Sequence, residues 1–188
     1  MTMWSRLQRL DNRLMRRSLR SRSPALDRTL VGITRATNYS KLWLLIPGAL
    51  AVIGGRQARG AAERGLISIA IAIEIEIAAT VANGPAKLLV GRRRPSRSPP
   101  TLIPMPRSTS FPSGHSASAF AFATGVCAEL PELAPVLLPL AGAVAYSRTH
   151  AGVHYPSDVA AGAAIGIASG VVAGRLQSCT RQLINVAT

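Results

Sequence analysis

The sequence predicts an all-α membrane protein: a polytopic bundle of about five transmembrane helices preceded by an amphipathic N-terminal segment. Hydrophobic residues make up 48% of the 188-residue chain, and its mean hydropathy is +0.25. The formal net charge is nevertheless +14, because 22 Lys and Arg face only 8 Asp and Glu. Apolar spans with Arg-rich ends are typical of small bacterial membrane proteins. We therefore expect an integral protein of a bacterial-type cell membrane, with the lipid bilayer as its partner.

Nucleic-acid binding is the competing explanation of the positive charge. Only 4% of the residues are aromatic, which leaves few platforms for stacking bases, and no zinc-finger or basic-zipper spacing occurs. The two cysteines, Cys127 and Cys179, form neither a metal-ligand motif nor a redox motif. We therefore predict no nucleic-acid partner and no cofactor.

Residues 1–41 form a basic N-terminal segment that contains ten of the 22 cations. Apolar residues recur at helical spacing on both sides of Pro24, and these are Leu7, Leu10, Leu14, Leu26, Leu30 and Ile33. The pattern predicts one or two short amphipathic helices lying on an anionic bilayer surface, with a disordered basic tail as the alternative.

Residues 42–176 are predicted to form a membrane-embedded domain, followed by a C-terminal tail at 177–188. The five predicted spans are residues 42–55, 65–83, 115–129, 133–147 and 157–174. A polar link is expected between the first two spans, at residues 56–64. The Ile/Ala alternation from Ile67 to Ile77 has the period of a strand, but the length of the segment and its alanines favour a helix. The last span is dense in small residues, which allow helices to approach closely.

Two acids, Glu74 and Glu76, lie within the second span. Ionisable groups at membrane depth are costly and usually face the interior of a bundle. Packing, assembly and catalysis all stay open as their roles, and a homo-oligomer is possible.

The segment 147–158, SRTHAGVHYPSD, gathers the residues with the clearest chemistry. If a helix begins near Pro156, Asp158 lies in its first turn and can reach back to His154. A carboxylate that holds one ring nitrogen of a histidine fixes its tautomer and leaves the other nitrogen free as a nucleophile. The guanidinium of Arg148 suits a phosphate group.

Two further segments contribute to the predicted site. In PSGH, residues 112–115, Ser113 suits a helix N-terminus, where free N–H groups favour an anion and His115 stands in the first turn. In KLLVGRRRP, residues 87–95, Lys87 and Arg94 supply cations. Spans of alternating direction bring these segments and 147–158 to one side of the membrane.

Together, Lys87-x6-Arg94-Pro95, Pro112-Ser113-Gly114-His115 and Ser147-Arg148-x5-His154-x3-Asp158 resemble the three-part signature of the type 2 phosphatidic acid phosphatase family. The flanking residues resemble those of small actinobacterial members. The family includes membrane lipid phosphatases and, more distantly, soluble acid phosphatases and vanadium haloperoxidases.

The resemblance implies a role for each signature residue. His154 would attack phosphorus and form a phosphohistidine, with Asp158 holding its ring. His115 would protonate the leaving alkoxide and then activate water. The implied phosphate-binding residues are Lys87, Arg94, Ser113, Gly114 and Arg148. Only Asp158 of the eight acids lies within the signature, too few for a two-metal site, so we predict no metal ligands and metal-independent hydrolysis.

The substrate expected from these features is a lipid phosphate that enters between helices. Phosphatidic acid, phosphatidylglycerol phosphate, a polyprenyl phosphate or diphosphate and a phosphorylated polyprenyl sugar all stay open. The alternatives are a non-catalytic membrane protein that binds anionic lipid and a vanadate-dependent haloperoxidase-like enzyme. Leaving out Lys87, Arg94 and Arg148, the side with the motifs carries fourteen cations against five, so the positive-inside rule predicts a cytoplasmic site, whereas the family more often acts on the outer face.

Overall fold

The computed structural model of the chain describes residues 3–37, 41–81, 91–95 and 100–187, and these contain seven α-helices, one short 3₁₀ helix and no strand. The helices are α1 (Met3–Arg20), α2 (Pro24–Thr37), α3 (Lys41–Ile53), α4 (Arg56–Val81), α6 (Gly114–Cys127), α7 (Ala134–His150) and α8 (Pro156–Ala187), with the 3₁₀ helix η2 at Pro131–Leu133. The predicted all-α fold is confirmed.

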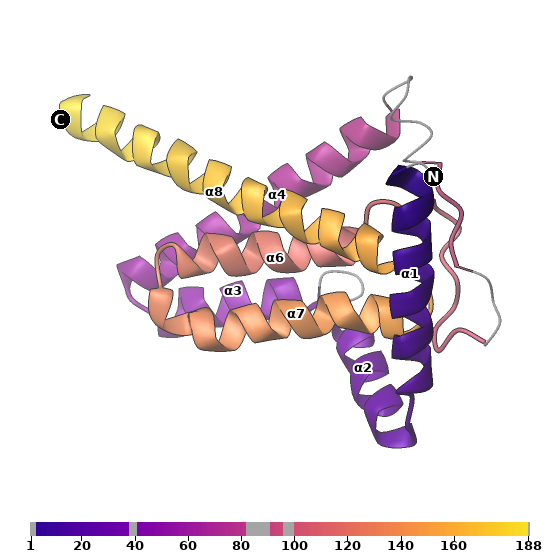
Figure 1. Cartoon of the computed structure of the whole chain (residues 1–188). Coiled ribbons are helices and arrows are strands. Elements are labelled where there is room, and N and C mark those ends of the chain that lie inside the picture. Colours follow the sequence, from indigo (N-terminus) through magenta and orange to yellow (C-terminus); the bar gives the residue numbers. More distant parts are fainter. Residues whose placement is uncertain (1–2, 38–40, 82–90, 96–99, 188) are drawn as a thin grey trace.

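The bundle consists of α3, α4, α6, α7 and α8, with α6 in contact with α4, α7 and α8 (Figure 1). Its apolar core is built where α3, α4, α6 and α7 meet. In this core Trp43 and Phe122 pack with their ring centroids 5.2 Å apart, and Val126 and Val144 are fully buried. The bundle therefore forms around side chains from four successive apolar segments.

The helices α6 and α8 approach most closely through glycines on α8. A Cβ atom added at Gly162 would lie 2.4 Å from the Ser113 carbonyl oxygen, and one added at Gly166 would lie 2.3 Å from the Ala117 carbonyl oxygen. No side chain fits between backbones at these distances. The predicted use of small residues in the last span is confirmed, and this seam fixes the start of α6 against the start of α8.

The helical reading of Ile67–Ile77 is correct, since these residues lie within α4. The polar link predicted at residues 56–64 is wrong, because α4 already begins at Arg56. The polar side chains at the start of α4 include buried Arg64, which forms an ion pair of 2.6 Å with Glu129 in the turn after α6. Glu74 is exposed on α4, and the side chain of Glu76 lies outside the described part of the structure.

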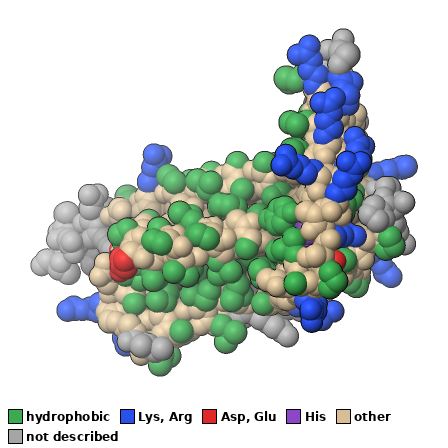
Figure 2. All heavy atoms as spheres, turned by 60° about the horizontal axis from the view of Figure 1, so that its bottom comes forward, with side chains coloured by type: hydrophobic (Ala, Val, Ile, Leu, Met, Phe, Trp, Pro, Cys, Tyr) green, Lys and Arg blue, Asp and Glu red, His purple; other side chains and the backbone are tan. Residues whose placement is uncertain are grey.

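Two amphipathic helices at the N-terminus are confirmed, with the break at residues 21–23. They lie at one end of the bundle, where α1 contacts α7 and α8, and α2 contacts α7 and α3 (Figure 1). Figure 2 shows hydrophobic side chains spread over the middle of the molecule, with Lys and Arg gathered toward its ends. This distribution is the one that an amphipathic N-terminal segment and an apolar bundle predict.

Among the described residues, one helical segment is long and apolar enough to cross a membrane: Pro156–Cys179, with 24 residues and a mean hydropathy of 1.6. The other bundle helices include α3, α6 and α7, with 13, 14 and 17 residues, whereas a bilayer core needs about 20. Five membrane crossings thus stay a prediction.

Candidate active site

The segment 147–158 folds as a helix end, a tight loop and a helix start. Gly152 has a positive φ of +82°, and this left-handed conformation ends α7. Glycine adopts it without steric strain because it has no Cβ atom. The N–H groups of the next two residues donate to the Arg148 carbonyl oxygen at 3.2 and 3.3 Å. The helix α8 then begins at Pro156, as predicted, because proline suits the first helical position.

A second loop, residues 91–95 and 100–113, lies against this segment. The Ser110 N–H donates to the Arg92 carbonyl oxygen at 2.8 Å, which brings two distant parts of the loop side by side. Arg94 donates from Nε and Nη2 to the carbonyl and hydroxyl oxygens of Ser108, at 2.9 and 3.0 Å. Its Nη1 donates to the Val153 carbonyl oxygen at 2.8 Å, so Arg94 joins both loops.

His154 is buried between these loops, with 3% of its surface exposed. Its Nδ1 lies 2.7 Å from the Ser110 carbonyl oxygen, which can only accept, so Nδ1 carries the proton. Its Nε2 therefore has the lone pair, and Arg94 Nη1 lies 3.0 Å from it. Burial, together with the charges of Arg94 and Arg148, lowers the pKa of the His154 imidazole to about 3. The ring is neutral at physiological pH, as a nucleophile requires.

Asp158 supports His154 through an intermediate residue. The nearest carboxylate oxygen lies 3.9 Å from Nδ1, which is too far for a hydrogen bond. The fully buried carboxylate instead accepts from the Ser110 hydroxyl, from the Tyr155 N–H at 2.9 Å and from Arg92 Nη1 at 2.7 Å. The direct contact between Asp158 and the His154 ring that the sequence predicted is therefore wrong. The prediction used the i, i+4 spacing of the two residues, and a local pattern does not include Ser110, which comes from a distant loop.

The PSGH segment forms the N-terminus of α6, as predicted. Ser113 has an extended backbone (φ −87°, ψ 104°) and precedes Gly114, the first residue of the helix, with His115 in the first turn. The Ser113 N–H donates to the Asp158 carbonyl oxygen at 3.0 Å, so the second and third motifs are joined directly. The next N–H groups of a helix have no acceptor within it and can bind an anion.

Arg148 is the clearest sign of an anion site. Its side chain is 2% exposed, yet its Nε and Nη1 atoms are buried with no hydrogen-bond partner among the described residues. Buried N–H groups without acceptors are costly, and the oxygens of a phosphate would satisfy them.

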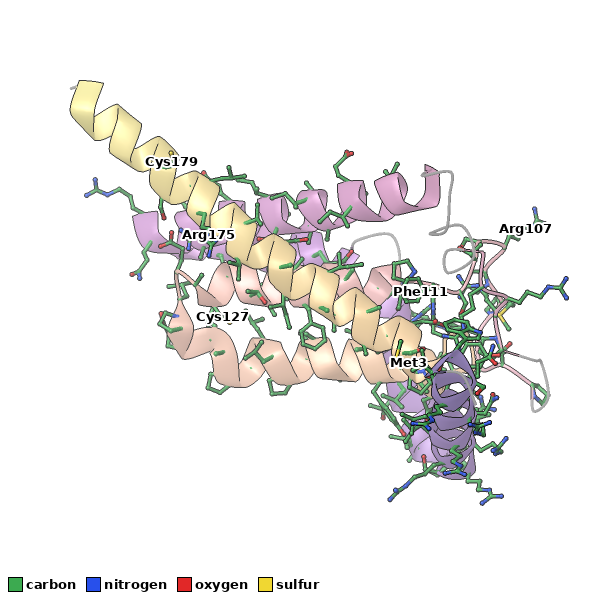
Figure 3. The ribbon with its side chains drawn as sticks, turned by 45° about the horizontal axis from the view of Figure 1, so that its top comes forward. Met3, Arg107, Phe111, Cys127, Arg175 and Cys179 are labelled. Carbon is green, nitrogen blue, oxygen red and sulfur yellow. The ribbon has the colours of Figure 1, made fainter. Side chains whose placement is uncertain are left out.

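The two loops and α6 enclose a cavity of about 620 Å³. It is lined by Arg94, Gly114, His115, Arg148 and His154 from the predicted site, and further by Ile73, Ile77, Pro106, Arg107, Ser108, Thr109, Phe111 and Pro112. Arg107 and Phe111 lie at the end of the bundle where α1 begins, opposite the end marked by Cys127, Arg175 and Cys179 (Figure 3). The cavity thus has a polar part made by the motifs and an apolar wall from α4.

Seven of the eight predicted site residues lie in the described structure, and they come together at this one end of the bundle. The eighth, Lys87, lies outside the described residues. Within those ranges, no group of three or more His, Cys, Asp and Glu side chains could hold a metal ion.

Three residues of the site were not singled out from the sequence. Arg92, the first of three consecutive arginines in KLLVGRRRP, pairs with Asp158. Ser110 holds His154, and Asp11 contacts Arg92 from α1. His150, to which the sequence assigned no role, lies in the last turn of α7 and pairs with Asp27 of α2 at 2.7 Å.

The geometry defines the class of protein: an all-helical enzyme whose buried cations, helix N-terminus and neutral imidazole suit a phosphate ester. The comparisons with known proteins agree. The chain belongs to the PAP2 superfamily, whose family model matches residues 68–179. The family predicted from the three motifs is confirmed.

Named relatives of this chain are phosphatases. It is 34% identical, over 155 residues, to decaprenylphosphoryl-5-phosphoribose phosphatase of Mycobacterium tuberculosis, with 79% of each chain covered. Among solved structures, it is similar to LpxE of Aquifex aeolicus, with a TM-score of 0.68, 26% identity and 88% and 95% of the two chains covered. The fold also matches a transmembrane PAP2 type phosphatidylglycerolphosphate phosphatase from Bacillus subtilis, with a TM-score of 0.69, 22% identity and 92% and 86% covered.

Proposed function

We propose that the protein is a membrane-embedded lipid phosphate phosphatase that works without a metal and forms a phosphohistidine at His154. The observation that carries the proposal is the cavity. It joins a neutral imidazole and the buried Arg148 guanidinium, whose Nε and Nη1 have no partner among the described residues, to an apolar wall formed by Ile73 and Ile77. A lipid needs both parts, because its phosphate is charged and its chain is apolar.

In the first step, His154 Nε2 attacks phosphorus and the bond from phosphorus to the ester oxygen breaks. Arg94 Nη1 donates toward Nε2 at 3.0 Å, and a phosphoryl group entering between the two takes over that hydrogen bond and frees the lone pair. His115 takes the proton that the substrate phosphate brings and gives it to the leaving alkoxide. In the second step a water gives a proton to His115 and attacks phosphorus, the P–N bond breaks, and inorganic phosphate leaves with the proton that His115 returns to it.

The phosphate-binding groups stabilise the charge that gathers on the equatorial oxygens. Arg94 and Arg148 supply cations, and the Ser113 hydroxyl and the Gly114 N–H supply donors at the start of α6. Lys87 completes the set by its place in the family motif. A non-catalytic lipid-binding protein would need none of the orientation that Ser110 and Arg94 impose on His154.

We further propose that α3, α4, α6, α7 and α8 cross the membrane, with the cavity at the end where α1 and α2 lie. The wall of α4 at Ile73 and Ile77 would then open the cavity to the lipid chains. The Mycobacterium tuberculosis relative makes a phosphorylated polyprenyl sugar the first substrate to test.

The direct test is phosphate release by the purified protein from a panel of lipids. The panel contains phosphatidic acid, phosphatidylglycerol phosphate, a polyprenyl phosphate, a polyprenyl diphosphate and a 5-phosphoribosyl polyprenyl phosphate, each in mixed micelles. We expect release from at least one lipid at a kcat/KM well above that for a water-soluble ester such as glycerol phosphate, because only the lipid fills the apolar part. Equal use of both, or no release from any lipid, would contradict the proposal.

Activity is expected to survive a chelator. The carboxylates of Asp11 and Asp158 are both paired with Arg92 and are not free to bind a cation. Phosphate release in excess EDTA should stay within about twofold of the untreated enzyme, measured after dialysis against chelator. A strict requirement for added Mg²⁺ would rule out the metal-independent mechanism.

A further inference from the structure

The N-terminal helix α1 buries one carboxylate against the active-site loops. Its six arginines are exposed, whereas Asp11 is only 2% exposed. Asp11 accepts from the backbone N–H of Ser157 at 2.9 Å and from the Ser157 hydroxyl at 2.6 Å. Ser157 lies in the first turn of α8, where an N–H group has no acceptor in its own helix. Asp11 therefore caps α8 from a helix nearly 150 residues earlier in the chain.

Arg92 connects this cap to the catalytic loop. Its Nη2 donates to Asp11 at 2.6 Å and its Nη1 donates to Asp158 at 2.7 Å, so one guanidinium bridges two buried carboxylates. The guanidinium also stacks on the Tyr155 ring, with Cζ 4.0 Å from the centroid. Burial by itself would lower the pKa of Arg92, but the hydrogen bond with Asp11 and the charges of Asp158 and Asp11 raise it above its usual value. The bridge stays charged.

From Asp158 the connection continues to the nucleophile. Asp158 accepts the hydroxyl proton of Ser110, and the Ser110 carbonyl oxygen accepts the Nδ1 proton of His154 at 2.7 Å. Each link is buried, and each residue has more than one partner. A shift of Arg92 therefore moves Asp158, then Ser110, and finally the imidazole.

We propose that Asp11 is a positioning residue of the active site, which acts through Arg92 and Asp158 to hold the Ser110 carbonyl that orients His154. The inference rests on the proposed role of His154 as the nucleophile. Without Asp11, one arm of Arg92 and the two Ser157 donors lose their buried acceptor, which lets Arg92 turn and the start of α8 move. Displacements of about 1 Å at a reacting group can cost about 10²-fold in rate.

The test is Asp11→Asn, which keeps the shape of the side chain and removes its charge. We expect kcat to fall on the order of 10²-fold, with KM and the inhibition constant of inorganic phosphate within about twofold of wild type. The phosphate-binding groups Arg94 and Arg148 do not contact Asp11, so binding should be spared. A purely structural role would instead reduce the fraction of active enzyme and weaken phosphate binding with it.

A double-mutant cycle tests the route. If Asp11 acts through Arg92, then Asp11→Asn should cost little more in the Arg92→Lys background, since lysine cannot bridge two carboxylates. Arg92→Lys alone should show the same loss of kcat at unchanged KM. It also serves as the second variant should Asp11→Asn fail to fold. Additive losses, or full kcat in Arg92→Lys, would overturn the inference.

Asp27→Asn is the matched control. Asp27 also joins an N-terminal helix to the bundle, through His150 at 2.7 Å, but it lies outside the connection from Asp11 to His154. We expect it to retain most of its kcat. An equal loss in Asp27→Asn would mean that the N-terminal helices matter only for packing, and unchanged kcat in Asp11→Asn beside an inactive His154→Ala would sink the inference while leaving the proposed function intact. An equally active His154→Ala would sink the function itself.

Discussion

Replacing His154 by alanine is expected to abolish phosphate release, whereas replacing His115 by alanine should leave a measurable residual activity. His154 forms the covalent bond to phosphorus in the proposed mechanism, and no other neutral imidazole in the described structure lies between Arg94 and the Ser110 carbonyl. His115 only moves protons, and a positioned acid or base is typically worth about 10²–10⁴-fold. The two variants should therefore differ by more than the assay noise.

The leaving group separates the two roles further. In an ester such as a nitrophenyl phosphate with a short alkyl chain, the leaving group is acidic. It departs as its anion and needs no proton. His115→Ala should then form the phosphohistidine at a near-normal rate but hydrolyse it slowly, because no base activates water. The measurement is rapid-quench labelling with ³²P, looking for a phosphoenzyme that is stable in base and labile in acid.

His154→Gln controls for changes in packing, since it fills the site without a ring nitrogen at the right place. Phosphate release from His154→Ala at wild-type rates, or an acid-stable phosphoenzyme in His115→Ala, would contradict this assignment of roles.

Gly166→Ala is expected to destroy activity, although Gly166 lies away from the cavity. The added Cβ would lie 2.3 Å from the Ala117 carbonyl oxygen and 2.7 Å from the Ala121 nitrogen, and both are backbone atoms of α6. Neither can move without moving the helix. Overpacking of this kind typically costs about 1–3 kcal/mol, and here it separates the start of α6 from the start of α8.

The matched control is Gly142→Ala in α7, where an added Cβ meets nothing within 4 Å. Thermal unfolding in detergent and phosphate release from the preferred lipid measure the two effects. We expect Gly142→Ala to match wild type or gain slight stability, because alanine favours a helix. Wild-type activity in Gly166→Ala would show that the helix seam does not position the motifs.

The motifs themselves could be predicted from the sequence because they are local. Proline at 156 marks the start of α8 and Gly114 follows an N-cap at Ser113, so the ends of the helices, and with them His115 and His154, could be located. Convergence of the motifs followed from alternating the direction of apolar spans, which requires only their order. The family resemblance added the roles of the residues to this placement.

The support around the motifs could not be predicted, because it depends on contacts between distant segments. Arg92 is one of three consecutive arginines and nothing in that run distinguishes it, yet it alone bridges Asp11 and Asp158. Asp11 looked like one acid in a basic helix. Ser110 acts through its carbonyl oxygen as well as its hydroxyl, and a backbone acceptor leaves no trace in a sequence.

The contact between Asp11 and Ser157 also bears on how the molecule is made. Because synthesis proceeds from the N-terminus, Asp11 is made nearly 150 residues before its hydrogen-bond partner Ser157. A nascent chain that stops between the second and third motifs contains neither His154 nor the Ser157 hydroxyl that bonds to α1. Under the proposed mechanism, a chain that ends before the third motif lacks the nucleophile His154 and cannot hydrolyse a phosphate ester.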